Sequence, residues 1–223
     1  LRCGPSRAKG GRRQSRCRAR RPQTGIPDPM PKPPSSPPAV EKLIAGLRGF
    51  RATYYEQKPE RLRPLVVGGQ SPAVLVIACS DSRIDPAILT DAEPGDLFVV
   101  RNVANLVPPY VADGTARGTS AAIEFAVRDL GVKHVIVLGH SRCGGIQAFA
   151  DNAPPGDFIG RWISLIAPAA RDIESREEAP GSYHTRLEQA SLVKSIDNLK
   201  SFPYVQTACD RGELALHGAY FNV

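Results

Sequence analysis

Two short apolar runs, each followed by a polar motif, constrain the fold of this chain more than any other feature. The first run is VLVIA at residues 74–78, followed by CSDSR at 79–83; the second is VIVL at 135–138, followed by HSRCGG at 140–145. Continuous apolar runs rich in β-branched residues are typical of strands buried on both faces. They predict two inner strands that each present polar side chains at the carboxyl end.

The rest of the chain alternates helical periodicity with further strand-like runs. Apolar residues recur at helical spacing over residues 39–55, 119–130, 158–175 and 183–199, and further strand-like runs cover residues 97–101 and 213–223. This alternation predicts an α/β fold, a single domain with a mostly parallel central sheet flanked by α-helices. Ligands of such sheets bind beyond the carboxyl ends of the strands, where both motifs fall. We also expect Asp85 and Pro86 to begin a short helix, and Trp162 to be buried.

The positive charge of the chain is concentrated in its first 29 residues. The whole chain carries a net charge of +7, but residues 1–29 hold nine Lys or Arg and a single acid, Asp28, so residues 30–223 carry a net charge of −1. Residues 1–29 also lack the apolar surface that could offset the entropy of ordering. We therefore expect residues 1–38 to be a disordered, basic and Pro-rich extension, and residues 39–223 to form the domain that carries both strand-end motifs.

Three interpretations of residues 1–29 compete. An Arg-rich run attracts phosphates, as in a nucleic-acid-binding arm, but no aromatic residues interleave with these arginines. A transit peptide is also rich in Arg and Ser, but it is normally amphipathic. We favour the third interpretation, in which Met30 is the natural start and residues 1–29 are an upstream extension. We expect no nucleic-acid partner, and no membrane partner because the sequence has no run of about 18 apolar residues.

The five cysteines do not suggest a disulfide framework. Their number is odd, their spacing is wide, and residues 1–29 contain no apolar segment typical of a secretory signal. These features favour a reducing compartment, so we expect a cytoplasmic protein and regard organelle targeting by residues 1–29 as the less favoured alternative. Cys209 lies outside both motifs, and we expect it to be an inert, partly buried thiol.

The residues that follow the two strands include three candidate zinc ligands. Zinc accepts thiolate and imidazole in tetrahedral geometry, and a catalytic site keeps one position open for water. His140 and Cys143 are three residues apart across a strand-to-helix turn, and Cys79 comes from the other strand end. An isolated HxxC pair is a weak signal, because a lone histidine there is more often structural. Two matched strand-end motifs favour a metal site.

Asp81 and Arg83 follow directly after the first of these cysteines. They could be no more than a cap and an ion pair. Alternatively, an aspartate held by Arg83 stays ionised, accepts a hydrogen bond from a zinc-bound hydroxide and orients it toward an electrophile.

Four motifs together resemble those of the β-class carbonic anhydrases: CSDSR at 79–83, RNVAN at 101–105, GHSRCGG at 139–145 and LHG at 216–218. The resemblance covers most of residues 40–223. It implies zinc-dependent, reversible hydration of carbon dioxide to bicarbonate and a proton by zinc-bound hydroxide. It also implies a homodimer, which relatives often pair into a homotetramer, with active sites near the subunit interface.

The resemblance assigns roles to individual residues. One Zn²⁺ per subunit is bound by Cys79, His140 and Cys143, and Asp81 with Arg83 forms the catalytic dyad.

The resemblance also implies a substrate slot for carbon dioxide. Gln70 supplies a side-chain amide donor, Phe98, Val103 and Phe125 line the slot, and Gly144 offers a backbone N–H at a helix start. Phe125 stands where plant-like members usually carry Tyr. Without the resemblance, the three apolar residues would be interpreted as core.

Two subgroups of this family differ in how the aspartate behaves. In the bicarbonate-regulated subgroup it can move from its arginine onto zinc, and a separate bicarbonate pocket uses a Trp, an Arg and a Tyr. Here Val76 and Phe221 occupy the Trp and Tyr positions, and only Arg101 is kept. We therefore expect the open, plant-like form, with three protein ligands and a water.

Two alternative functions stay open. Relatives of this family hydrolyse carbon disulfide or carbonyl sulfide by the same zinc chemistry, and the motifs do not separate these substrates from carbon dioxide. A non-catalytic zinc-binding or redox-sensing module is the other alternative, but such a module would not need the pair of Asp81 and Arg83.

Overall fold

The computed structural model describes residues 37–154, 156–174 and 182–223. The chain divides into two units, residues 1–44 and 45–223, and the first described helix, α1 (Pro38–Arg51), spans the boundary between them. The expected basic extension and Met30 fall on residues 1–36, outside the described residues. The predicted boundary at residue 38 therefore stays a prediction.

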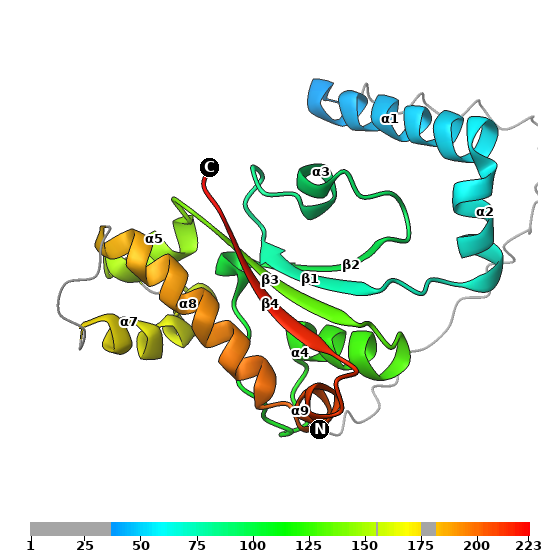
Figure 1. Cartoon of the computed structure of the whole chain (residues 1–223). Helices are drawn as coiled ribbons and strands as arrows, with labels where there is room; N and C mark the ends of the chain where they lie inside the picture. Colours follow the sequence, from blue (N-terminus) through cyan, green and yellow to red (C-terminus); the bar gives the residue numbers. More distant parts are fainter. Residues whose placement is uncertain (1–36, 155, 175–181) are drawn as a thin grey trace, which may run out of the picture. The chain divides into compact units, whose positions relative to one another are not determined.

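Four parallel strands form one sheet in the second unit (Figure 1). Their order is β2-β1-β3-β4, so β1 and β3 are the inner strands, as the sequence predicts, and β2 and β4 lie at the edges. The bounds are β1 (Val74–Cys79), β2 (Leu97–Asn102), β3 (His134–His140) and β4 (Ala215–Phe221). The expected α/β fold with a parallel sheet and flanking helices is confirmed.

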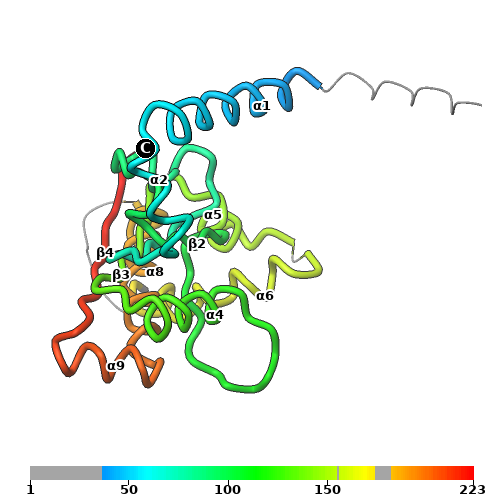
Figure 2. The backbone as a smooth tube through the Cα atoms, turned by 90° about the vertical axis from the view of Figure 1, so that its right-hand side faces the viewer, coloured from blue at the N-terminus to red at the C-terminus, as the bar shows by residue number. Residues whose placement is uncertain are grey.

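The main core lies between one face of the sheet and the helices packed on it. Leu75 and Ile77 of β1 and Val135 and Val137 of β3 point into this core and are fully buried. Helix α8 (Tyr183–Lys200) packs along β3 and β4 (Figure 1). Near the amino ends of these strands, α9 (Pro203–Asp210) lies beside the π-helical turn η3 (Phe125–Asp129) that follows α4 (Gly118–Glu124) (Figure 2).

The remaining helices are shorter. They are listed by position along the chain: η1 (Ala52–Gln57), α2 (Pro59–Gly68), α3 (Pro86–Thr90), η2 (Val103–Asn105), α5 (Gly144–Ala150), α6 (Ile159–Ile163), η4 (Ser164–Ile166) and α7 (Ala167–Glu174). None of the described helices combines the length and apolar character that crossing a bilayer requires.

Several local predictions can be compared with these elements. Asp85 caps α3 as expected, because its side chain accepts hydrogen bonds from the N–H groups of Ala87 and Ile88. The helices α2 and α9 were not predicted, although each begins with a proline, which is favoured at the first helical position. Cys209 in α9 is half-buried, and burial raises the pKa of its thiol, as expected for an inert cysteine.

The expectation that Trp162 is buried is wrong. The side chain is only half-buried, and its Nε1 donates a hydrogen bond to the carbonyl oxygen of Val103 at 2.7 Å. An indole combines a large apolar ring with one polar N–H, so it can remain at the surface where that N–H finds an acceptor.

Candidate active site

The topology of the sheet brings three metal-ligand side chains together. Cys79 is the last residue of β1 and His140 the last residue of β3, and these strands are parallel neighbours. Cys143 follows at the N-cap of α5. The ligand atoms of the three residues lie within 4.8 Å of one another, and the two Sγ atoms are 3.9 Å apart. All three side chains are buried.

The imidazole of His140 has one nitrogen left to bind an ion. Its Nδ1 lies 2.9 Å from the carbonyl oxygen of Ser141, which can only accept, so Nδ1 carries the proton. Nε2 is buried and has no hydrogen-bond partner among the described residues. A buried imidazole nitrogen without a partner is costly unless a metal ion binds it.

The two thiols compete for one proton. The hydrogen bond with Cys143 is the main reason that the pKa of Cys79 falls to about 4, against the opposing effect of burial. The same hydrogen bond, together with burial and the charge on Cys79, raises the pKa of Cys143 far above its usual range. A divalent cation between the sulfurs would stabilise both as thiolates. Two sulfurs and one imidazole nitrogen therefore form a donor set that fits zinc.

Asp81 and Arg83 form a two-pronged ion pair next to this cluster. Arg83 Nε donates to Asp81 Oδ1 at 2.9 Å, and Arg83 Nη2 donates to Asp81 Oδ2 at 2.7 Å. The backbone N–H of Arg83 also donates to Oδ1, at 3.0 Å. These hydrogen bonds hold the pKa of Asp81 far below its usual range. Asp81 is therefore ionised and bound to its arginine, while the expected open form with three protein ligands and a water stays a prediction.

Arg101 holds the backbone that carries this pair. Its Nε donates to the carbonyl oxygen of Cys79 at 3.0 Å, and its Nη2 donates to the carbonyl oxygen of Asp81 at 2.6 Å. Its Nη1 is paired with Asp85 at 3.0 Å. Sequence reasoning placed Arg101 in a regulatory position and missed this contact with the strand end.

Of the expected slot residues, Val103 and Gly144 lie at the cluster. Gly144 directly follows Cys143, and a Cβ atom on the next residue, Gly145, would lie 2.7 Å from Val103 Cγ1. Only glycine at position 145 lets the start of α5 approach Val103 this closely. In η2, the residue after Val103 is Ala104, which has a positive φ of 66°, so the chain turns sharply there, beside Cys79.

The other slot residues do not lie at the cluster of their own chain. Phe98 pairs with Leu75, four residues before Cys79 along the sheet, which corresponds to about 13 Å. Phe125 packs on Phe98, with ring centroids 5.9 Å apart. Gln70 is exposed and precedes the amino end of β1, at the opposite end of the strand from Cys79.

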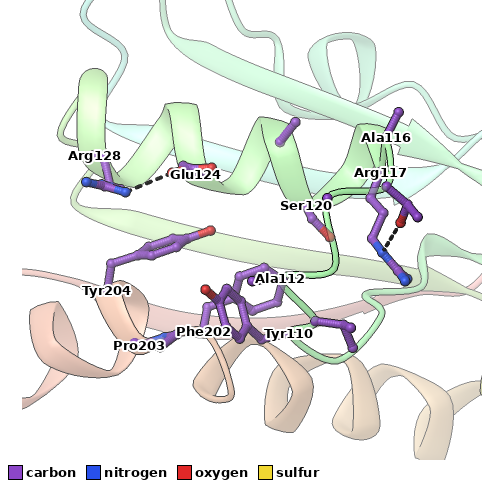
Figure 3. A pocket seen from close by; sticks show the side chains of 14 residues that line it. Tyr110, Ala112, Ala116, Arg117, Ser120, Glu124, Arg128, Phe202, Pro203 and Tyr204 are labelled. Atoms are coloured by element: carbon purple, nitrogen blue, oxygen red, sulfur yellow. Dashed lines mark hydrogen bonds and ion pairs between the residues drawn. The ribbon is translucent and has the colours of Figure 1, made fainter.

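Of two hollows in the described structure, one borders the cluster and the other does not. A groove of about 900 Å³ is lined by Arg101, Val103, Phe158 and Trp162 among others, so it borders the strand ends. A second cavity of about 720 Å³ lies between the 110–117 loop, α4 and the start of α9 (Figure 3).

The second cavity contains none of the expected site residues. Its lining includes Tyr110, Phe202 and Tyr204, and the arginines in it are already paired: Arg128 with Glu124 at 2.8 Å, and Arg117 with Thr115 and Asp113 (Figure 3). The cavity therefore offers a ligand no unpaired charge from these arginines.

Comparison with known proteins identifies the family. A sequence model described as "Carbonic anhydrase" matches residues 74–223. Beta carbonic anhydrase 3 of Arabidopsis thaliana is 36% identical over 192 residues, which are 82% of this chain and 73% of that protein. Beta carbonic anhydrase 5, chloroplastic, of the same plant is 42% identical over 161 residues, 69% of this chain. This chain covers only about half (52%) of that second relative's length.

Solved structures agree with the sequence relatives. The β-carbonic anhydrase CcaA superposes with a TM-score of 0.73 at 30% identity, over 83% of this chain and 84% of that one. A tetrameric β-carbonic anhydrase from Sordaria macrospora gives a TM-score of 0.71 at 29% identity, over 82% and 92% of the two chains. The region matched by the family model contains both strand ends and all three clustered side chains. This chain belongs to the β-class carbonic anhydrase family.

Proposed function

We propose that this chain catalyses the reversible hydration of carbon dioxide to bicarbonate and a proton, with one zinc ion per subunit bound by Cys79, His140 and Cys143. The observation that carries this proposal is the buried group of two thiols and an unpartnered imidazole nitrogen beside the Asp81–Arg83 pair. When bound, zinc supplies a Lewis acid that brings the pKa of a coordinated water toward about 7.

Asp81 orients the reacting group at this site. Oδ1 already accepts two hydrogen bonds from Arg83 and Oδ2 accepts one, so Oδ2 keeps the greater capacity to accept another. Because Arg83 keeps the carboxylate ionised, Asp81 can accept a hydrogen bond from an attacking O–H group but cannot donate one. This fixes the direction of the attacking oxygen's remaining lone pairs.

We propose a homodimer as the smallest complete unit. Val103 and Gly144 reach the site from the same chain, whereas Gln70, Phe98 and Phe125 lie too far from their own cluster to line it. A second copy could bring these three residues to the slot. The Sordaria macrospora relatives described as tetrameric support further pairing of such dimers.

Hydrolysis of carbon disulfide or carbonyl sulfide is the alternative reaction. It needs the same metal ligands and the same ionised Asp81, so only the slot and its entrance distinguish the substrates. The groove beside Val103 and Trp162 is broad enough to admit carbon dioxide and either sulfide, so it does not discriminate between these substrates. We propose the cytoplasm as the location, with a plastid as the alternative because one relative's name includes "chloroplastic".

The test compares the wild type with Asp81→Asn. We expect about one zinc per wild-type chain, rapid carbon dioxide hydration in stopped-flow assays and little sulfide release. Asp81→Asn should retain zinc and lose at least about 100-fold in rate, the usual range for a positioned acid or base. Asp91→Asn is the matched control, since Asp91 is exposed and asparagine tolerates its left-handed backbone. Equal rates in wild type and Asp81→Asn would contradict the assigned role, and faster sulfide release would favour the alternative substrate.

A further inference from the structure

A buried carboxyl group lies behind the candidate metal centre. Glu188 on α8 is only 6% exposed. Its Oε1 accepts a hydrogen bond from the backbone N–H of Cys143 at 3.1 Å, and its Oε2 accepts one from the hydroxyl of Tyr220 at 2.6 Å. Burying a carboxyl group is unfavourable unless its oxygens are bonded in this way. An apolar residue would fill the same space, so the two hydrogen bonds call for an explanation.

The bond to Cys143 holds one end of a peptide group whose other end is held by Arg83. Arg83 Nη2 donates to the carbonyl oxygen of Arg142 at 3.1 Å, and the N–H of the same peptide group donates to Glu188. A guanidinium therefore faces the negative end of the peptide dipole, and a carboxyl group faces its positive end. Hydrogen bonds to charged partners are stronger than those between neutral groups.

This peptide group needs to be held, because the residue before it is strained. Arg142 has a φ of 55°, in the left-handed region that residues with a Cβ atom rarely adopt. It lies between His140 and Cys143, two of the three clustered side chains. A rotation of the Arg142–Cys143 peptide toward a relaxed conformation would move two groups together: the Cys143 sulfur and the Arg142 carbonyl oxygen that accepts from Arg83.

Strand β4 fixes the other side of Glu188. Tyr220 pairs with Gly139 in the sheet, and the backbone N–H of Ser141 donates to the carbonyl oxygen of Phe221 at 2.9 Å. Burial and the hydrogen bond to Glu188 raise the pKa of Tyr220, so its hydroxyl keeps the proton that it donates. Glu188 is thus anchored to the strand that borders the ligand loop.

We propose that Glu188 is a positioning residue for both the Cys143 ligand and Arg83, acting through the Arg142–Cys143 peptide group. One continuous chain of hydrogen bonds then links Asp81 to Tyr220 through Arg83, this peptide group and Glu188. This inference rests on the proposed function, because it takes Cys143 to be a zinc ligand. It adds a contact on the metal-ligand loop that none of the sequence motifs contains.

The experiment measures metal binding separately from activity. Glu188→Met keeps the length of the side chain and removes both acceptors, and Glu188→Gln keeps an amide oxygen that can accept from Cys143. Asp197→Ala, which removes an exposed carboxylate from the same helix, is the control. Zinc affinity is measured on full-length apo-protein against a chromophoric chelator, and the thiolate-to-metal absorption is recorded after loading with Co²⁺.

We expect Glu188→Met to bind zinc about 10- to 100-fold more weakly, the usual range for a group that supports a metal ligand, and to alter the Co²⁺ spectrum. Glu188→Gln should recover most of the affinity, and Asp197→Ala should match the wild type. Glu188→Met combined with Tyr220→Phe avoids an unpaired buried hydroxyl, and this double variant replaces the single one if the latter does not fold.

Two results would overturn the inference in distinguishable ways. If the wild type binds zinc and hydrates carbon dioxide, but folded Glu188→Met has the wild-type affinity and Co²⁺ spectrum, Glu188 does not position Cys143 and the proposed function stands. A lower melting temperature with unchanged affinity leads to the same conclusion, since it reflects a structural role alone. If the wild type itself binds no zinc, the proposed function and this inference both fail.

Discussion

The two strand ends that form the candidate site are each held by a more distant side chain, a hydrogen-bond donor at one end and an acceptor at the other. At the end of β1, Arg101 donates hydrogen bonds to the carbonyl oxygens of Cys79 and Asp81. At the end of β3, the carboxyl group of Glu188 accepts a hydrogen bond from the N–H of Cys143. Arg101 thus fixes the first end through its carbonyl groups, and Glu188 fixes the second through an amide N–H.

The ends also differ in how far they are removed from solvent. His140 and Cys143 are 1% and 2% exposed, whereas the side chains of Asp81 and Arg83 are 16% and 46% exposed. The β3 end therefore contributes two of the proposed ligands, both buried, and suits metal binding. The β1 end contributes the third proposed ligand and an accessible charged pair that suits the proposed reaction. Substitutions at the two ends should separate metal affinity from turnover.

The largest effect should come from the β3 end. His140→Ala removes the only imidazole among the three grouped ligands and should abolish both zinc binding and activity. His134→Ala is the matched control, because His134 begins the same strand, is exposed and lies at the opposite end from the cluster. Zinc content after dialysis against a chelator, read by atomic absorption, distinguishes the two. Retention of one zinc per chain in His140→Ala would remove this histidine from the proposed ligand set.

Metal removal should show that the ion joins the two ends. If zinc binds the folded chain as proposed, free zinc at 100 times its dissociation constant should stabilise the protein by about 2.7 kcal/mol relative to the apo-protein. Thermal unfolding with and without chelator measures this difference. The same titration on Cys79→Ser should show a much smaller gain, since a serine hydroxyl does not replace a thiolate. An equal gain in that variant would mean that the β1 end is not linked through the metal.

Substitution of Arg83 should affect turnover far more than metal content. Arg83→Met removes the side-chain hydrogen bonds to both oxygens of Asp81 and leaves the backbone N–H bond to Oδ1, and it should lower kcat at least about 100-fold while zinc is retained. Arg83→Lys should be intermediate, because an ammonium group cannot reproduce the two-pronged contact of a guanidinium. Stopped-flow rates with parallel zinc assays test the series. If zinc falls as much as the rate, the ion pair holds the metal site together and the proposed division between the ends is wrong.

Arg101 should have a smaller effect of the same kind. Arg101→Met removes the donors to two carbonyl oxygens at the end of β1, and displacement of Asp81 should lower kcat about 10-fold, within the range for residues that support a site. Arg128→Met serves as the control, since it removes an exposed pair with Glu124 and a cation–π contact with Tyr204, neither of which involves the end of β1. An unchanged kcat in Arg101→Met would show that the strand end is held without its arginine.

The sheet and the clustered ligands could be predicted from sequence because their signals are local. The apolar runs that end at Cys79 and His140 identify inner strands, and the side chains that follow such strands converge at one edge. The contacts of Arg101 and Glu188 depend on which helix and strand pack behind the cluster. Helical periodicity places Glu188 on α8 but does not say that it faces Cys143, 45 residues earlier.

The arrangement of the proposed substrate slot is a second feature that the sequence could not predict. The family resemblance assigns Phe98, Phe125 and Gln70 to one slot with Val103, but the register of β1 and β2 separates Phe98 from Cys79 by four residue positions. A single chain contains no information on which surface of a second copy covers the site, so the assembly had to be taken from relatives. If the proposed slot is correct, the distances within one chain imply that Gln70, Phe98 and Phe125 come from a second copy.

The smallest expected effect concerns the proposed substrate slot. Phe125 is 44% exposed and packs on Phe98, so a hydroxyl added by Phe125→Tyr can be accommodated without disturbing the core. If a second copy brings Phe125 to the slot, the new hydroxyl should change the KM for carbon dioxide a few-fold and leave zinc content unchanged, as expected for one polar contact worth about 1 kcal/mol. Ile88→Thr, at another exposed apolar position, should leave KM unchanged. Sedimentation at decreasing protein concentration measures dissociation of the dimer, and the rate of carbon dioxide hydration in the same samples should fall with it. A fully active monomer would place the whole slot within one chain.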